Sequence, residues 1–271
     1  MTDKYAVIGH PIAHSKSPLI HKMFAEQTGQ DISYEAIEAP LDGFAAKVME
    51  LREKGYKGCN VTVPFKFEAY QLAKRNHEYV FSERAANTLK FDGDIILGDN
   101  TDGMGLVRDI QSNLGMTLNN RRVLLIGAGG AAYGVALPLR DAGAILKIVN
   151  RTADKAQALA SGLKSNNTNI SGCSFDELAD HQFDVVINAT SAGLTDSKLP
   201  LPTTLFAPGA LAYDMMYGRV TPFMKFAREH GAAVVSDGLG MLVEQAAESF
   251  FIWRGVRPET APVIEALRKF E

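Results

Sequence analysis

One segment of this chain limits its fold more than any other. The apolar run R-V-L-L-I at 122–126 is followed directly by G-A-G-G-A-A at 127–132, and a helical pattern then continues to about Ala142. A continuous apolar strand is typical of a parallel sheet whose two faces are both covered. A strand, a glycine-rich turn and a helix in this order form the fingerprint of a dinucleotide-binding unit. The sequence therefore predicts a Rossmann-like domain. The alternative is a glycine-rich turn that binds no ligand.

The small residues of this fingerprint have separate physical roles. Gly127 permits the tight turn, Gly129 lets a pyrophosphate approach backbone N–H groups, and Ala132 lets the helix pack closely on the strand. The pyrophosphate would then lie at the positive end of the helix dipole. The segment therefore predicts where the cofactor's phosphates bind.

The end of the next strand indicates which dinucleotide is preferred. An Asp or Glu about twenty residues after the glycines would bind the ribose 2′-hydroxyl of NAD. This chain instead has Asn150-Arg151-Thr152, with Lys155 one turn later. A guanidinium pairs bidentately with a phosphate, whereas a carboxylate would repel it. The sequence therefore predicts NADP, and the alternative for Arg151 and Lys155 is an ordinary solvated helix start.

Composition and charge exclude several classes of protein. The 271 residues are 46% apolar and 22% charged, which suits one large or two modest globular domains and not a disordered chain. A net charge of −3 offers no basic surface to nucleic acid or to a membrane. No apolar run approaches the ~18 residues that span a bilayer, and the N-terminus lacks the pattern of a signal peptide. We expect a cytoplasmic protein with no nucleic-acid or membrane partner. We also expect a monomer or a homodimer.

The cysteines and histidines predict no metal site. Cys59 and Cys173 are not part of a C-x-x-C pair, so neither a disulfide framework nor a zinc ribbon is expected. His10 and His14 have the spacing of an H-x-x-x-H pair, but Pro11 interrupts any helix there.

Along the chain, short apolar strands alternate with amphipathic helices, which favours an α/β fold. Ser17 is predicted to cap the first helix, with Pro18 at its first position. The expected strands are 5–9, 34–37, 60–63, 122–126, 146–149, 183–187, 211–214 and 232–235, with a hairpin of 87–91 and 94–97. The expected helices begin at 17 and cover 44–53, 103–114, 130–142, 153–163, 241–253 and 258–270. We predict one domain from residues 1–102 plus 242–271, and a second from residues 103–241.

Polar residues gather at element ends in the first half of the chain. On strand 60–63, Asn60 and Thr62 face one way and Val61 and Val63 face the other. Lys66 follows shortly after this strand. By residue type alone, these polar side chains suit a solvated sheet face and a surface lysine equally well.

Two further clusters have the same ambiguity. Ser15 and Ser17 flank Lys16, and Asn87 and Asp102 stand in turn segments. By residue type alone, Ser17 and Asp102 are equally suited to cap the helices that follow them.

Taken together and in this order, these segments resemble the shikimate dehydrogenase family. The resemblance extends along nearly the whole chain, and H-S-K-S-P, N-V-T-V-P-F-K and G-D-N-T-D-G are its matching segments in the first half. The segments at 60–66 and 98–103 are the most specific. The matching segments are 14–18, 60–66, 98–103, 127–131, 150–152, 188–191, 213–217 and 237–242.

The resemblance implies the NADP-dependent reduction of 3-dehydroshikimate to shikimate, a step towards chorismate and the aromatic amino acids. It implies that Lys66 and Asp102 form the catalytic acid–base pair. The implied substrate-binding residues are Ser15, Ser17, Asn60, Thr62, Lys66, Asn87, Asp102, Tyr217 and Gln245. The implied cofactor-binding residues are Gly127, Ala128, Gly129, Gly130, Ala131, Asn150, Arg151, Thr152, Lys155, Thr190, Met215 and Gly238.

The implied fold has an N-terminal α/β substrate domain and a Rossmann-like NADP-binding domain, with the C-terminal helices returning to the first domain. A cleft between two domains is a common place for such a site. The sequence departs from the family pattern in the stretch 78–84, where Arg84 replaces a usual glycine, and at Lys155, where many members have arginine.

The chemistry fits these residue types independently. Hydride transfer to a ketone carbon leaves a developing alkoxide, which a lysine ammonium stabilises and protonates. A neighbouring carboxylate orients the ammonium and keeps it charged. Two alternatives stay open: a quinate/shikimate dehydrogenase that uses both NAD and NADP, and a non-catalytic NADP-binding sensor. Lys66 and Asp102 argue against the sensor, which needs no proton donor.

Overall fold

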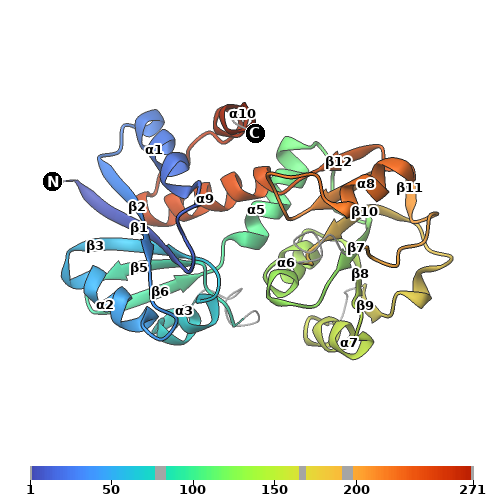
Figure 1. Cartoon of the computed structure of the whole chain (residues 1–271), viewed down its shortest axis with the longest axis horizontal. Helices are drawn as coiled ribbons and strands as arrows, with labels where there is room; N and C mark the ends of the chain where they lie inside the picture. The colour runs from blue at the N-terminus through green and yellow to red at the C-terminus, as the bar shows by residue number, and fades with distance from the viewer. Residues whose placement is uncertain (1, 77–83, 165–168, 191–197, 270–271) are drawn as a thin grey trace. The chain divides into compact units, whose positions relative to one another are not determined.

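The computed structural model describes residues 2–76, 84–164, 169–190 and 198–269. The chain divides into two compact units, Met1–Gly105 with Val243–Glu271, and Leu106–Leu242. Figure 1 shows the elements of each unit. The sequence analysis predicted the two boundaries between domains at residues 102/103 and 241/242.

The described residues of the first unit form a six-stranded mixed sheet with the order β2-β1-β3-β5-β6-β4. Strands β1, β2 and β3 are parallel, whereas β5 runs antiparallel to both β3 and β6. The strands are β1 (Asp3–Gly9), β2 (Ile32–Glu38), β3 (Tyr56–Val61), β4 (Arg75–Asn76), β5 (Thr88–Asp92) and β6 (Ile95–Asp99).

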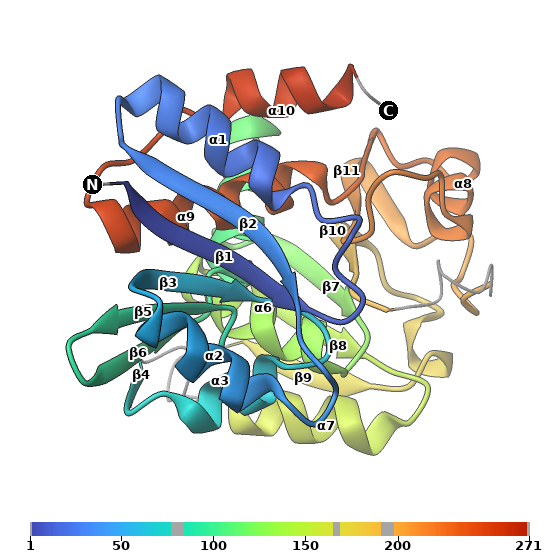
Figure 2. The ribbon, with the colours of Figure 1, turned by 60° about the vertical axis from the view of Figure 1, so that its left-hand side comes forward.

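Helices cover both faces of this sheet. Figures 1 and 2 show α1, α9 and α10 on one face and α2 and α3 on the other. On the second face, Phe44 and Phe65 stack at 5.0 Å within a buried apolar cluster that includes Ile8 and Leu89. The helices are α1 (Ser17–Thr28), α2 (Phe44–Glu53), α3 (Lys66–Leu72), α9 (Leu239–Arg254) and α10 (Ala261–Arg268).

Strand register brings the predicted polar residues to one edge of the sheet. Asn60 at the end of β3 pairs with Thr88 at the start of β5, and Thr88 pairs with Asp99 at the end of β6. Because β5 is antiparallel, its first residue lies at the same edge as the last residues of its neighbours. The segments that follow β1, β3 and β6 therefore begin side by side.

The described residues of the second unit form a parallel six-stranded sheet with the order β12-β11-β10-β7-β8-β9. The order reverses between β7 and β10, which makes their carboxyl ends the topological switch point where open α/β sheets bind ligands. Helix α6 packs on β7 and β8, α7 on β8 and β9, and α8 on β11 and β12. The strands are β7 (Arg122–Ile126), β8 (Ile145–Val149), β9 (Ile170–Cys173), β10 (Phe183–Asn188), β11 (Phe206–Asp214) and β12 (Val234–Ser236). The helices are α6 (Gly130–Asp141), α7 (Ala153–Gly162) and α8 (Pro222–Glu229). Helix α5 (Asp102–Arg108) begins in the first unit and ends in the second.

The predicted α/β fold with a Rossmann-like sheet is confirmed, but two local predictions were wrong. Helix α1 begins at Ser17, so Lys16 occupies the cap position and Ser17 lies one residue inside. The Ser17 backbone N–H donates to Ser15 Oγ at 3.3 Å, so the capping oxygen comes from Ser15. Strand β3 ends at Val61, which is buried, and Val63 beyond it is 68% exposed, so these two valines do not share a buried face.

Other differences concern short elements. The predicted helix 103–114 is an α-helix only to Arg108, and a π-helical turn follows at Asp109–Asn113. The sequence did not predict α3, β9 or α8. Of the atypical stretch 78–84, only Arg84 lies among the described residues, and its φ is +50°.

None of the helices in the described part of the chain has the length and hydrophobicity needed to cross a bilayer. Among the same residues, no group of three or more His, Cys, Asp and Glu side chains is arranged to hold a metal ion.

Candidate active site

The centre of the first unit's site is a carboxylate held between two donors. Lys66 is the first residue of α3, Asp102 is the first residue of α5, and Asn87 precedes β5 directly. Lys66 Nζ donates to Asp102 Oδ2, and Asn87 Nδ2 donates to Asp102 Oδ1 at 2.8 Å. Each carboxylate oxygen therefore has its own donor, which fixes the plane of the group.

The Lys66 ammonium is accessible to solvent, although the main chain of this residue is held in place. Its side chain is 30% exposed and that of Asp102 is 18% exposed. The preceding Phe65 is fully buried, and the Ala86 N–H donates to the Lys66 carbonyl at 2.8 Å. An anchored main chain and a partly exposed ammonium suit a group that exchanges a proton with a bound ligand.

A main-chain donor shows which end of the Asn87 amide is the oxygen. The Thr101 N–H can only donate, and it reaches Asn87 Oδ1 at 2.9 Å. The Thr88 hydroxyl donates to the same oxygen at 2.8 Å. Nδ2 must therefore face Asp102, and Asn87 is only 3% exposed.

The Asn60 amide is used within the protein. Its Nδ2 lies within hydrogen-bond distance of the Asn87 carbonyl (3.1 Å), Thr88 Oγ1 (3.1 Å) and Ser249 Oγ (2.9 Å). Its Oδ1 accepts from the Tyr34 hydroxyl at 2.8 Å. Both ends of the Asn60 amide are therefore engaged within the protein, and 6% of its surface is exposed.

Thr62 and Gln245 lie at the same edge of the sheet. The Thr62 N–H donates to the Ile8 carbonyl, and its methyl group covers Gly9, where a Cβ would lie 2.5 Å away. Gln245 Oε1 is 3.4 Å from Asn87 Nδ2 and 3.5 Å from Thr101 Oγ1. The structure thus places Thr62, Asn87 and Gln245 around the ends of these strands.

The two predicted serines flank the start of α1. Ser15 is half-buried and Ser17 is 8% exposed. Tyr217 belongs to the second unit, where it follows β11 and is half-buried. The assignment of all three to the substrate carboxylate stays a prediction.

In the second unit, the glycine turn has the shape that a pyrophosphate requires. Gly127 has a φ of +113°, a conformation that favours glycine, and its N–H donates to the Val149 carbonyl. Gly129, Gly130 and Ala131 are exposed at the start of α6, and a Cβ on either glycine would meet open space. The first N–H groups of a helix lack partners within it, so this turn offers several donors to an anion.

The loop after β8 presents positive charge. Arg151 and Lys155 are both exposed, and they stand on either side of the start of α7. Asn150 Nδ2 donates to the Thr152 carbonyl at 3.0 Å, which shapes the loop. These residues fit a ribose phosphate, as the sequence predicted for NADP.

Thr190 stands at the switch point beside the glycine turn. Its methyl group would lie 3.2 Å from a Cβ at Gly127. Its N–H and hydroxyl both donate to Asn188 Oδ1, and Asn188 Nδ2 donates to Asp214 Oδ2 at 3.1 Å. The buried Asp214 also accepts from the Met216 N–H, so one carboxylate organises both loop ends.

Met215 and Gly238 are in close contact. The Gly238 N–H donates to the Met216 carbonyl, and a Cβ at Gly238 would lie 2.3 Å from the Met215 carbonyl oxygen. Only glycine permits this approach without movement of the main chain. The second unit thus brings residues 127–131, Thr190, Met215 and Gly238 to the carboxyl-end side of its sheet. Residues 150–155 follow the parallel strand β8 and begin at the same side.

Sequence reasoning missed several residues that organise these sites. Four residues that were not predicted bond directly to predicted ones: Tyr34, Thr88, Thr101 and Ser249. A fifth, Asp214, bonds to Asn188, which accepts from the predicted Thr190. A usable signal existed for Ser249, because it stands one helical turn after Gln245 and therefore on the same face of α9.

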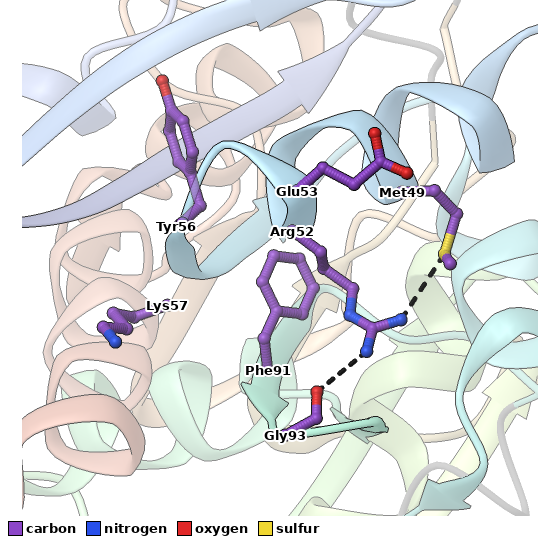
Figure 3. A pocket seen from close by; sticks show the side chains of 8 residues that line it. Met49, Arg52, Glu53, Tyr56, Lys57, Phe91 and Gly93 are labelled. Atoms are coloured by element: carbon purple, nitrogen blue, oxygen red, sulfur yellow. Dashed lines mark hydrogen bonds between the residues drawn. The ribbon is translucent and has the colours of Figure 1, made fainter.

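A further groove of about 380 Å³ lies at the start of β3 and contains none of the predicted residues. Figure 3 shows the Arg52 guanidinium directed at Gly93 and Met49. It donates to the Gly93 carbonyl at 2.8 Å and lies 3.6 Å from Met49 Sδ. Two of its donors are therefore used inside the protein.

Three family models match successive parts of the chain. Residues 7–89 match the shikimate dehydrogenase substrate binding domain, residues 109–195 match shikimate / quinate 5-dehydrogenase, and residues 238–268 match the shikimate 5′-dehydrogenase C-terminal domain.

Whole-chain relatives agree. The shikimate dehydrogenase (NADP(+)) of Methylobacillus flagellatus is 62% identical over 267 residues, covering 98% of this chain and 99% of that protein. An Ael1 enzyme from Pseudomonas putida has a crystal structure with 50% identity and a TM-score of 0.93, covering 98% of both chains. The shikimate 5-dehydrogenase of Thermus thermophilus, solved in complex with NADP(H) and shikimate, has 32% identity and a TM-score of 0.88, covering 99% of both. Sequence and fold agree, and this chain belongs to the NADP(+)-dependent shikimate dehydrogenase family.

Proposed function

We propose that Lys66 is the group that gives and takes the proton when this shikimate dehydrogenase interconverts 3-dehydroshikimate and shikimate. The observation that carries the proposal is the fixed contact of Lys66, Asp102 and Asn87. When bound, NADPH supplies the hydride to the ketone carbon. The Lys66 ammonium then donates its proton to the oxygen on which negative charge develops. In the oxidation of shikimate, the neutral amine accepts that hydroxyl proton.

Asp102 supports this exchange without being the proton donor. Its carboxylate holds the Lys66 Nζ in place through one oxygen, and the Asn87 amide holds the other oxygen. Correct placement of a reacting group matters strongly, because a misplacement of about 1 Å can reduce a rate 10²-fold. We therefore assign Asp102 the role of orienting the ammonium and stabilising its charge.

The remaining polar residues at the sheet edge suit a small ring that carries hydroxyls and a carboxylate. We assign Thr62, Asn87 and Gln245 to ring hydroxyls. Ser15 and Ser17 offer hydroxyl groups to the carboxylate. Their common position at the ends of β1, β3 and β6 supports this assignment.

In the second unit, we assign residues 127–131 to the pyrophosphate, and Asn150, Arg151, Thr152 and Lys155 to the adenosine ribose and its 2′-phosphate. Thr190, Met215 and Gly238 would border the nicotinamide. The exposed amides at the start of α6 and the two exposed cations after β8 support the assignment.

The test of the reaction is the initial rate of NADP⁺ reduction at 340 nm with shikimate, beside NAD⁺ and beside quinate. We expect turnover with shikimate and NADP⁺ to exceed that of every other pair. The second candidate function is a dual-specificity quinate/shikimate dehydrogenase, which the shikimate / quinate family model keeps open. Comparable efficiency with quinate or NAD⁺ would favour it, and no turnover with any pair would favour a non-catalytic sensor.

The test of the residue assignment is Lys66→Ala beside Lys22→Ala, an exposed lysine of α1. Loss of a general acid–base group lowers kcat by roughly 10²–10⁴-fold. We expect that loss for Lys66→Ala, with little change in shikimate affinity, and wild-type kcat for Lys22→Ala. A near-normal kcat for Lys66→Ala would remove Lys66 from the catalytic role.

We also propose that the enzyme works in the cytoplasm as a monomer or a homodimer. Cell fractionation and light scattering after gel filtration test these two points. A larger assembly would contradict the second.

A further inference from the structure

The fully buried hydroxyl of Ser249 lies at the centre of the hydrogen bonds beneath the substrate-side site. It is 2.9 Å from Asn60 Nδ2, 2.8 Å from Thr88 Oγ1 and 3.2 Å from Thr101 Oγ1. It also donates to the Gln245 carbonyl at 3.0 Å. The Ser249 hydroxyl of helix α9 therefore contacts three segments of the first unit. These are the end of β3, the start of β5 and the residues that follow β6.

The number of protons in this cluster restricts its arrangement. Ser249 has one proton and two lone pairs. When its proton goes to the Gln245 carbonyl, Ser249 accepts from Asn60 and from one threonine hydroxyl. The other threonine hydroxyl is then free to donate to Asn87 Oδ1, which Thr88 reaches at 2.8 Å and Thr101 at 3.1 Å.

This arrangement supports the orientation in which the Asn87 amide donates to Asp102. Its oxygen receives a hydroxyl and the Thr101 N–H, so its Nδ2 is left to donate to Asp102 Oδ1. Asp102 in turn accepts from Lys66 through its other oxygen. The Ser249 hydroxyl is thus linked through three hydrogen-bonded side chains to the ammonium that exchanges the proton.

We infer that Ser249 and Asn60 are positioning residues that hold the Asn87 amide in the orientation in which it donates to Asp102. Neither residue needs to touch the substrate, and for Asn60 this replaces the substrate-binding role that the sequence suggested. The inference rests on the proposed role of the Lys66–Asp102 pair. A buried donor without an acceptor is costly, so loss of the Ser249 oxygen forces the cluster to rearrange.

The experiment compares Ser249→Ala with Thr28→Val. Thr28 is a matched control in the same unit, because its hydroxyl bonds to the carbonyl four residues earlier in α1, as that of Ser249 does in α9. We expect Ser249→Ala to lower kcat/KM for shikimate about tenfold with KM for NADP⁺ within about twofold of wild type. Thr28→Val should leave both unchanged. An unchanged kcat/KM for shikimate, or a rise in KM for NADP⁺ as large as the loss in kcat/KM for shikimate, would overturn the inference.

A double-mutant cycle distinguishes positioning from general support. In the Asn87→Ala background, Ser249→Ala should cost less than about twofold further, because the amide through which it acts is gone. Full additivity would contradict the inference. Thr88→Val is nearly isosteric and serves as the second variant if Ser249→Ala does not fold, with the same expected split between shikimate and NADP⁺. If the proposed function itself is wrong, Lys66→Ala keeps its activity whatever these variants do.

Discussion

The predicted ligand-binding residues of the two units differ in burial and in their hydrogen bonds to the rest of the protein. In the first unit, the amides of Asn60 and Asn87 are nearly buried and bonded on both sides by the protein's own groups. In the second unit, Gly129, Gly130 and Arg151 are exposed, with open space at both glycines. The substrate side is thus ordered by its own hydrogen bonds, whereas the cofactor side presents donors and charges whose partners come from the ligand.

The difference follows from what each region must do. Exchange of a proton demands side chains held within a fraction of an ångström, which a network of buried donors and acceptors supplies. Recognition of a phosphate demands charge and N–H donors, and long exposed cations can move to meet it. Substitutions on the two sides should therefore change different kinetic constants.

The largest effect is expected from a substitution at the centre of the substrate side, which is ordered by its own hydrogen bonds. Asp102→Asn keeps the shape of the side chain but removes the charge that faces the Lys66 ammonium. We expect kcat for shikimate oxidation to fall about 10²–10³-fold, the usual share of a group in an acid–base pair. NADPH affinity, measured by its fluorescence on binding, should stay nearly unchanged. Asp92→Asn in the β5–β6 turn is the control, and an equal loss of NADPH affinity would contradict the separation of the two sides.

The second-largest effect is expected on the cofactor side, at the exposed residue Arg151. Arg151→Ala removes a charge-assisted contact to the 2′-phosphate, and such contacts contribute about 1.5–3 kcal/mol. We expect KM for NADP⁺ to rise by roughly 10–100-fold, while KM for NAD⁺, which has no 2′-phosphate, stays nearly constant. Steady-state kinetics with both cofactors measure this, with the exposed Arg228→Ala as control. A parallel rise for both cofactors would refute the phosphate assignment.

The third effect concerns the stability of the ordered side in acid. His21 is fully buried, stacks on Tyr34 at 4.1 Å, and has no hydrogen-bond partner for either ring nitrogen among the described residues. Burial lowers the pKa of its imidazole to about 3. The unfolded chain, in which the pKa is about 6.5, therefore binds a proton that the folded chain excludes, and stability falls as the pH drops from about 6.5 towards 3.

His21→Phe keeps the stacking and removes this proton uptake. Between pH 8 and pH 5, the decrease in the free energy of unfolding should be about 2 kcal/mol smaller in the variant than in the wild type. Urea unfolding at the two pH values measures the difference. His230→Phe, a change in the second unit, should leave the wild-type pH dependence in place. An unchanged slope in His21→Phe would mean that other groups cause the acid sensitivity.

The smallest effect is expected at Lys155. It is exposed and offers a point charge, and exposed ion pairs contribute about 0–1 kcal/mol. We expect Lys155→Ala to raise KM for NADP⁺ about two- to fivefold, and added salt of about 0.5 M to remove most of the difference because it screens exposed charges. A rise as large as that of Arg151→Ala would give Lys155 an equal share in binding the phosphate.

The same contrast explains which features could be predicted from sequence. The glycine turn at 127–131 and the cations at 151 and 155 depend on local pattern, so the sequence predicted both the Rossmann-like sheet and the cofactor segment. The resemblance of whole segments pointed to Lys66 and Asp102, and strand register brings them into contact.

The interior of the ordered side was not predictable in this way. Ser249 is separated from Asn60 by 189 residues, and only the packing of α9 on the sheet brings them together. Ser17 was expected to cap α1, but the oxygen of Ser15 does so, because helix ends depend on single main-chain torsions. Val63 was expected to face the same way as Val61, but the strand ends before it and alternation no longer applies.

The hydroxyl cluster around Ser249 has a consequence for inhibitors. It holds Asn87, Asp102 and Lys66 in one arrangement, so a rigid hydroxylated ring loses little free energy to ordering the protein when it binds at Lys66 and Asp102. A compound that targets Arg151 must instead immobilise an exposed, flexible side chain. Fragments that occupy the substrate side should therefore show the higher affinity per non-hydrogen atom, and make the better starting points for synthesis.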